Sequence, residues 1–139
     1  MKKYDNYVAN LNVLEGAADQ DLSNEFVASG IISKFSLQFE LAWKLLKETL
    51  AYEGVAEAAS GSPRQIAKAA FAAYDFLDED VWLDMLRARS AITHTYDGET
   101  VRELVRLIIE EYTPAFIELR QGLEGLYGDT LFAEEEAEA

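Results

Sequence analysis

One short segment gathers residue types that could carry out proton transfer or bind phosphate. Residues 87–98, RARSAITHTYDG, hold the single histidine of the chain, His94, with Arg89 before it and Tyr96 after it. A guanidinium can hold a phosphate through paired hydrogen bonds, and an imidazole can transfer a proton near neutral pH. A phenol can donate a proton or be covalently modified. The three groups act as a unit only if they converge.

Arg89 and His94 can converge only if the helix that carries Arg89 ends between them, or if a second copy of the segment lies opposite. On one continuous helix, Arg89 and His94 would point about 140° apart, at 3.6 residues per turn. β-Branched residues followed by Gly98 predict a helix end over residues 93–96. The spacing also fits a structural explanation, in which His94 caps a helix C-terminus and the arginines are solvated or paired with acids. From spacing alone the structural explanation is favoured.

The chain around this segment is strongly acidic. Its 139 residues include 26 Asp and Glu against 12 Lys and Arg, which gives a formal net charge of −14. Such a surface repels nucleic acid and anionic membranes on average. The window 87–106 carries four arginines and is the best candidate for a phosphate contact. RNA binding is therefore expected to be weak or confined to this window.

Composition excludes several classes of site. The chain has no cysteine, which excludes disulfides, thiolate metal sites and cysteine nucleophiles. The acidic cluster 75–80 lacks the spacing and the glycine of a calcium loop, and one histidine makes a di-iron site improbable. No metal or cofactor is predicted. No apolar run approaches the ~20 residues that span a bilayer, and no signal peptide is recognised, so a cytoplasmic location is expected.

Helical periodicity dominates the sequence and predicts an all-α protein. The expected architecture is an antiparallel up-and-down bundle of four to five helices, two of them long. A single domain is expected over residues 1–128, followed by an acidic flexible tail over 129–139. The predicted helices run over about residues 3–15, from 21 or 23 to 53, 63–74, 78–93 and 99–123, with a kink at Pro114.

The second helix carries two apolar stripes, which predicts burial on two sides. One side would face the core of the domain and the other a second copy, so a homodimer is favoured. The first stripe comprises Phe26, Ile31, Phe35, Phe39, Ala42, Trp43 and Leu46, and the second comprises Leu37, Leu41 and Leu45.

Two sequence blocks together resemble a known family. Arg89, His94 and Tyr96 match the arginine–x4–histidine–x–tyrosine motif of HEPN proteins. Upstream, FELAWKLLKETLAYEG over 39–54 is similar to the corresponding helix of the bacterial nucleotidyltransferase substrate-binding protein group. The resemblance covers roughly residues 26–112, and the two blocks in this order are fairly specific.

The resemblance implies a helical, homodimeric HEPN bundle that forms a complex with a minimal nucleotidyltransferase encoded beside it. Some such pairs resemble toxin–antitoxin modules, in which the HEPN subunit is a metal-independent ribonuclease silenced by nucleotide addition to the motif tyrosine. By this resemblance His94 would be the general acid or base, Arg89 would hold the scissile phosphate, and Tyr96 would accept the modification. Glu40 would be an acidic partner that orients Arg89 or His94. Asp97, which follows Tyr96, is included among the candidate binding residues.

One residue departs from the family motif. The position after the arginine usually carries asparagine or another good hydrogen-bonding residue, and here it is Ser90, which reaches less far. This departure bears on nuclease activity more than on the fold. Glu40 also has a structural explanation, because Lys44 stands four residues later and the two can form a surface ion pair.

The sequence and the resemblance together suggest three candidate functions, which are given in order of preference. The first is a partner subunit that binds a minimal nucleotidyltransferase and presents Tyr96 to it. The second is an endoribonuclease that uses Arg89 and His94 across the dimer. The third is a structural dimeric bundle that retains the motif without its activity.

Overall fold

Every regular element that the structure describes is a helix, which confirms the all-α prediction. The computed structural model describes residues 1–59, 61–94 and 97–133, and only the backbone of His94. The α-helices are α1 (Lys2–Glu15), α2 (Glu25–Tyr52), α3 (Pro63–Ala73), α4 (Glu79–Ala91), α5 (Gly98–Leu107) and α6 (Thr113–Tyr127). The 3-10 helices are η1 (Gly16–Asp19), η2 (Ala56–Ala59) and η3 (Ile92–His94), and η4 (Ile108–Tyr112) is a π-helix.

Local signals in the sequence set the helix boundaries. The Asn24 side chain accepts hydrogen bonds from the first backbone N–H groups of α2, and Gly54 follows that helix with a φ of 78°, which suits glycine. Ser62 and Gln65 form the predicted capping box at the start of α3. Asp78 caps α4. The signals at Ser62 and Asp78 place α3 and α4 close to their predicted spans, whereas α2 begins after Asn24 rather than after Asp21 or Ser23.

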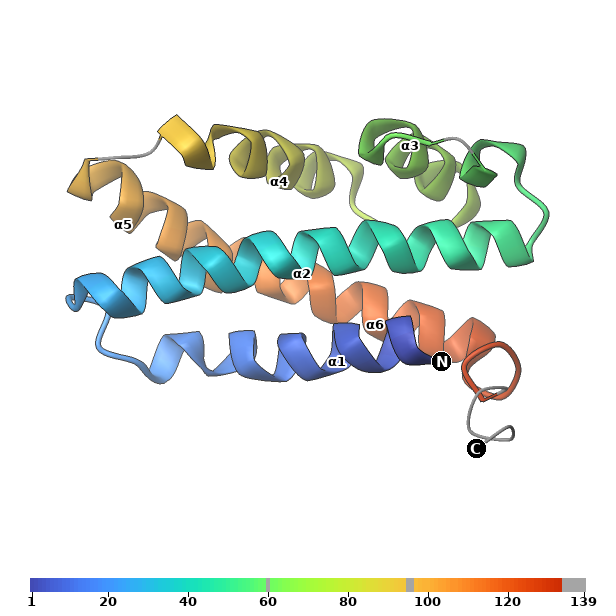
Figure 1. The fold of residues 1–139 in the computed structure, drawn as a ribbon, viewed down its shortest axis with the longest axis horizontal. Coiled ribbons are helices and arrows are strands. Elements are labelled where there is room, and N and C mark those ends of the chain that lie inside the picture. Colours follow the sequence, from blue (N-terminus) through green and yellow to red (C-terminus); the bar gives the residue numbers. More distant parts are fainter. Residues whose placement is uncertain (60, 95–96, 134–139) are drawn as a thin grey trace.

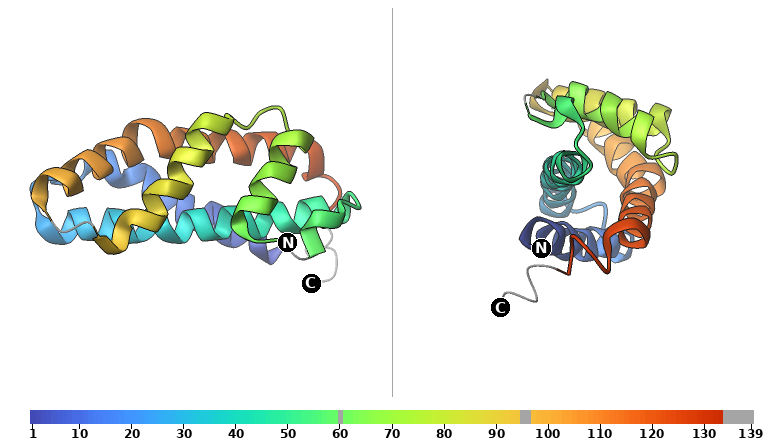
Figure 2. Two further views of the ribbon diagram at one scale, coloured as in Figure 1. Left: turned by 90° about the horizontal axis from the view of Figure 1, so that it is seen from above. Right: turned by 90° about the vertical axis from the view of Figure 1, so that its right-hand side faces the viewer.

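Helix α2 lies at the centre of the molecule. It contacts α1, α3, α4 and α5, with α1 on one side of it and α3 and α4 on the other (Figure 1). In the views from above and from the end, the segment from α5 to α6 runs beside α2 (Figure 2). The two apolar stripes of α2 therefore both have neighbours within the chain. Leu45 is fully buried, whereas Leu37 remains 41% exposed.

Phe26 was predicted to lie on the first apolar stripe of α2, and the structure places it off that stripe. Phe26 is 87% exposed, while Ile31, Phe35 and Phe39 are buried as predicted. Phe26 and Ile31 are five residues apart, which turns Phe26 away from the stripe at 3.6 residues per turn. Ala28 occupies the matching position and is buried.

The last long helical run continues through Pro114 rather than stopping there, as predicted. Proline has no backbone N–H and cannot donate to the carbonyl four residues before it. The π-helix η4 ends at Tyr112, two residues before Pro114, and joins α5 to α6. The irregular turn that proline requires is thus a π-helix, a form that the sequence pattern did not predict.

A buried polar network holds α1 against α2 and α6. The Asn10 amide donates to Gln38 Oε1 at 2.7 Å and to the Lys34 carbonyl at 3.0 Å. The Gln38 amide donates to the Tyr7 carbonyl at 3.1 Å, and the Tyr7 hydroxyl donates to the Phe116 carbonyl at 2.6 Å. These polar groups are buried and satisfied, so the network fixes the register of the packed helices.

The segment after α6 folds back on the first helix. Phe132 is buried, stacks on Tyr4 with 4.2 Å between ring centroids, and its carbonyl accepts a hydrogen bond from the amino group of Met1 at 3.0 Å. The predicted boundary between bundle and tail at residue 128 stays a prediction, and the tail residues 134–139 lie outside the described ranges. No helix within the described ranges is both long and apolar enough to cross a bilayer.

Candidate functional site

The motif segment lies where α4 leads into α5, at the end of the molecule where α1 also leads into α2 (Figure 1). Helix α4 ends at Ala91, and the 3-10 helix η3 continues to His94. The α-helix therefore ends between Arg89 and His94, which is one of the two arrangements that would let their side chains converge. The side chain of His94 and the whole of Tyr96 lie outside the described residues.

Arg89 lies over an aromatic ring of α2. Its guanidinium carbon is 5.5 Å from the centroid of the Phe39 ring, and Phe39 is only 4% exposed. A guanidinium over an aromatic face is attracted by the ring quadrupole. The buried ring therefore lies against one face of the Arg89 guanidinium, and the residue as a whole is partly exposed.

Glu40 lies within the electrostatic reach of Arg89, yet its ion pair is with another residue. Lys44 Nζ lies 3.0 Å from Glu40 Oε1, as the structural explanation predicted. The hydrogen bond from Lys44 lowers the pKa of Glu40, and the charges of Lys44 and Arg89 lower it further, against the effect of partial burial. Both explanations of Glu40 thus retain support.

The Ser90 hydroxyl makes a hydrogen bond within its own helix. The Ser90 Oγ donates to the Leu86 carbonyl at 3.0 Å, an arrangement common for serine within helices. The hydroxyl still has lone pairs that can accept a hydrogen bond. An asparagine at this position would reach further from the helix, so the departure from the motif shortens the polar reach of the site.

Asp97 acts as the N-cap of α5. Its carboxylate accepts hydrogen bonds from the backbone N–H of Thr100 at 2.8 Å and from the Thr100 hydroxyl at 2.7 Å. These bonds lower the pKa of Asp97 below its ordinary value. The candidate binding role of Asp97 therefore competes with a structural role as a helix cap.

The remaining arginines of the window differ in how far acids neutralise them. Arg87 pairs with Asp84 at 3.0 Å. Arg106 pairs with Glu103 and Glu110, each at 2.6 Å, and these two carboxylates raise its pKa. Arg102 has no ion-pair partner among the residues that the structure describes. Within the window 87–106, Arg89 and Arg102 are thus the arginines without an ion pair to a described residue.

Phe39 is a site residue that the sequence did not reveal as such. Its apolar character predicted burial, and nothing in the spacing of the 39–54 block indicated that its ring would meet Arg89. That contact depends on how α4 crosses α2, which is a tertiary property. Among the described residues, no group of three or more His, Asp or Glu side chains is placed to hold a metal ion.

Comparison with known protein families gives one match. The family model described as nucleotidyltransferase substrate binding protein like matches residues 2–125, which is most of the chain. No curated protein matches the sequence. The match covers α1 to α5 and nearly all of α6, and it includes the whole segment from Arg89 to Asp97.

Proposed function

The chain belongs to the family of nucleotidyltransferase substrate-binding-like proteins, and from this membership we propose that it is a partner subunit of a minimal nucleotidyltransferase. It serves as a substrate-binding subunit or as the toxin component of a two-gene toxin–antitoxin module. In this role the chain forms an antiparallel bundle that pairs as a homodimer in the cytoplasm. The family match over residues 2–125 is the observation that carries the proposal.

The position of the motif segment supports this role. Residues 92–98 join two helices at one end of the bundle, and Thr93, Asp97 and Gly98 are exposed. A partner enzyme that adds a nucleotide needs its target outside the core. We place that target at Tyr96, between these exposed residues.

Co-expression with the product of the neighbouring gene tests the partnership. The expected result is a stable complex on size-exclusion chromatography and, with nucleoside triphosphate present, a nucleotide-sized gain in intact mass. The Tyr96→Phe variant should form the complex without the mass gain. Tyr52→Phe is the matched control, because this exposed tyrosine lies outside the motif. Absence of a complex would overturn the partner role, and a mass gain that persists in Tyr96→Phe would remove Tyr96 as the target.

A metal-independent endoribonuclease is the second candidate function. The contact of Arg89 with Phe39 favours it, because a guanidinium held at a fixed place suits binding of the phosphate that becomes more charged during cleavage. His94 would act as general acid or base. Because the net charge is strongly negative, RNA binding in this role would be weak or confined to the arginines of the window 87–106.

RNA incubated with the purified protein and EDTA tests the ribonuclease. We expect His94→Ala and Arg89→Gln to abolish cleavage and Arg87→Gln to leave it intact, because Arg87 already pairs with Asp84. Ser90→Asn should raise cleavage by restoring the usual motif residue. Cleavage that persists in His94→Ala would remove His94 from the mechanism. A chain that neither cleaves RNA nor binds a nucleotidyltransferase would be a structural dimeric bundle.

A further inference from the structure

A continuous groove between α1 and α2 has no role in the functions described so far. The two helices run side by side (Figure 1), and the end view shows no other described helix on the outer side of this pair (Figure 2). Two grooves lie along the pair, with volumes of about 340 Å³ and about 430 Å³. Val13 and Lys34 line both of them, so together they form one longer groove, the α1–α2 groove.

The residues of α2 that line this groove have the spacing of a helix-packing seam. Five of them follow one another at intervals of three and four residues: Val27, Gly30, Lys34, Leu37 and Leu41. Residues with this alternation lie along one side of a helix and pack against a neighbouring helix. From Val27 to Leu41 the seam extends about 21 Å at 1.5 Å per residue, which is enough for about four turns of a docked helix.

Gly30 leaves room for another helix to approach. Glycine is among the least favourable residues inside an α-helix, and Gly30 lies well within α2. A Cβ at this position would meet nothing within 4 Å, so packing within the described chain does not require glycine there. The absence of a side chain lets a neighbouring backbone come close. Val13 on α1 is 58% exposed and Leu37 is 41% exposed, so the apolar walls on both sides are open to a partner.

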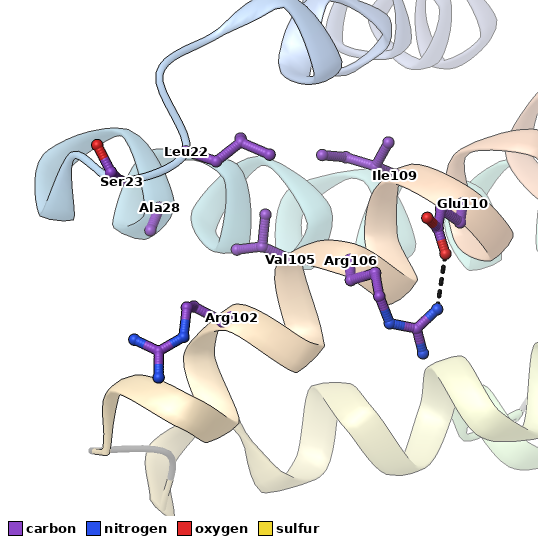
Figure 3. Close-up of a pocket in the computed structure, with 8 residues that line it drawn as sticks. All are labelled: Leu22, Ser23, Ala28, Arg102, Val105, Arg106, Ile109 and Glu110. Carbon is purple, nitrogen blue, oxygen red and sulfur yellow. Dashed lines mark hydrogen bonds and ion pairs between the residues drawn. The ribbon is translucent and has the colours of Figure 1, made fainter.

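The α1–α2 groove also lacks acidic residues. No Asp or Glu is among its described lining residues, although 26 of the 139 residues of the chain are acidic. By contrast, Glu110 lines the groove at the start of α2, where it pairs with Arg106 (Figure 3). Glu99 and Glu103 line the groove between α4 and α5. A strongly acidic chain meets another protein with least repulsion where its own negative charges are absent.

Lys34 indicates the charge of the occupant. This residue is exposed and has no ion-pair partner among the residues that the structure describes. It lies in the middle of the seam and lines both parts of the groove, so it places one positive charge among apolar side chains. A second copy of the same face would bring another Lys34 and no acid to this place. An amphipathic helix with one acidic residue beside its apolar stripe would pair with Lys34.

We propose that the α1–α2 groove binds an amphipathic helix of the partner nucleotidyltransferase, with one acidic side chain of that helix on Lys34. This inference rests on the proposed function, because it names the surface through which the proposed subunit holds its enzyme. The groove continues to Gln20, at the end of the molecule where the motif segment also lies (Figure 1). An enzyme docked along the groove would reach the motif segment from that end, and the homodimer would use another face.

Affinity for the nucleotidyltransferase, the product of the neighbouring gene, tests the inference. Gly30→Leu fills the groove and should weaken the complex at least tenfold in biolayer interferometry. Gly125→Leu is the matched control, because a Cβ on Gly125 also meets nothing within 4 Å and this residue lies on α6. It should change the affinity by less than twofold. Circular dichroism should show that Gly30→Leu melts no earlier than wild type, so that loss of binding is not loss of the fold.

Charge reversal gives a second pair of variants. Lys34→Glu should weaken the complex at least tenfold, because it places two negative charges opposite one another. Lys68→Glu makes the same change in net charge on α3, where Lys68 is exposed. Helix α3 lies on the other side of α2 from α1 (Figure 1), so this control should change the affinity by less than twofold.

Four results would overturn the inference. A wild-type complex that either Gly30→Leu or Lys34→Glu leaves intact would show that the enzyme does not use the groove as described. Equal losses in the control variants would indicate a general effect of added bulk or negative charge. A chain that dimerises alone and becomes monomeric as Gly30→Leu would place a second copy in the groove. Absence of any complex with wild type would overturn the proposed function, and this inference with it, whereas the first three results leave the proposed function standing.

Discussion

At the scale of single residues, the site depends on what holds Arg89. Its guanidinium rests on the buried Phe39 ring at 5.5 Å, and the ring in turn packs near Trp82, with 6.4 Å between centroids. Phe39 therefore both fills the core and supports the cation. The Arg89 side chain loses less conformational freedom on binding a phosphate if it is already held in place.

A double-mutant cycle on Phe39→Leu and Arg89→Gln measures this contact. Phe39→Leu retains most of the buried volume and removes the ring quadrupole. We expect a coupling free energy of about 0.5–1 kcal/mol, as for partly exposed cation–π pairs, from urea unfolding followed by circular dichroism. The same cycle with Arg87, which pairs with Asp84, should give no coupling. Coupling near zero for Arg89 would mean that the ring does not hold it.

The buried amide network makes a second prediction at this scale. Asn10→Ala removes the donor to Gln38 Oε1 and leaves that oxygen buried without its partner. The free energy of unfolding should fall by about 1–3 kcal/mol, the cost of an unsatisfied buried polar group. Asn12→Ala, on the exposed face of α1, should change it by no more than about 0.5 kcal/mol. Equal effects in urea unfolding would contradict the structural role of the network.

Site residues differ in how far sequence could predict them. The arginine, histidine and tyrosine spacing identified the segment, and the family match includes it. Phe39 gained its proposed role only from packing. That role depends on where α4 crosses α2. The crossing leaves no periodic signal in the sequence, because it joins residues through the tertiary fold.

At the scale of elements, close packing on α6 explains one glycine. A Cβ on Gly122 would lie 2.5 Å from the ring of Phe76, which belongs to the connection between α3 and α4. Nothing lies within 4 Å of a Cβ on Gly125, three residues later on the same helix. The first glycine is thus required by packing and the second is not.

Paired alanine substitutions test that distinction. Gly122→Ala should lower the free energy of unfolding by about 1–3 kcal/mol, because Phe76 must move to avoid an overpacked contact. Gly125→Ala should raise it by up to about 1 kcal/mol, because alanine favours an exposed helix position. Thermal unfolding monitored by circular dichroism gives both values. A stabilising Gly122→Ala would show that Phe76 does not pack on α6 as described.

The start of α5 should depend on pH through its cap. The pKa of Asp97 is lowered from an ordinary value of 3.8 by its bonds to Thr100, so the ionised cap contributes fully above about pH 4. The contribution is lost as pH falls through the lowered folded value. Wild type should exceed Asp97→Ala in melting temperature by an amount that shrinks under acid. In an NMR titration, Thr100→Val should raise the pKa of Asp97. A melting-temperature difference between wild type and Asp97→Ala that stays constant with pH would contradict the role of Asp97 as a cap.

Helix positions could be predicted from sequence because their signals are local. The capping box at Ser62, the cap at Asp78 and the stop at Gly54 all act within one helical turn. The exposure of Phe26 and the π-helix before Pro114 could not be predicted in the same way. Phe26 is exposed because Ala28, and not Phe26, lies on the buried face of α2. The π-helix arises because the long helix must accommodate the missing backbone N–H of Pro114 while the helical segments before and after it stay packed.

At the scale of the whole molecule, net charge and local charge have opposite effects. The excess of acids over bases, −14 in total, makes the folded chain repel itself. Exposed ion pairs such as Lys3 with Glu48 and Lys44 with Glu40 oppose this only weakly, at about 0–1 kcal/mol each. Arg102, which has no ion-pair partner among the described residues, is a local exception on this acidic surface.

A salt titration should separate these two effects. Raising ionic strength from about 0.01 M to about 0.15 M shortens the Debye length from about 30 Å to about 8 Å. The melting temperature should rise, because screening relieves more repulsion than it weakens in ion pairs. Choline chloride should reproduce this rise if screening is its cause. A melting temperature that falls with salt would mean that the ion pairs dominate the stability of the fold.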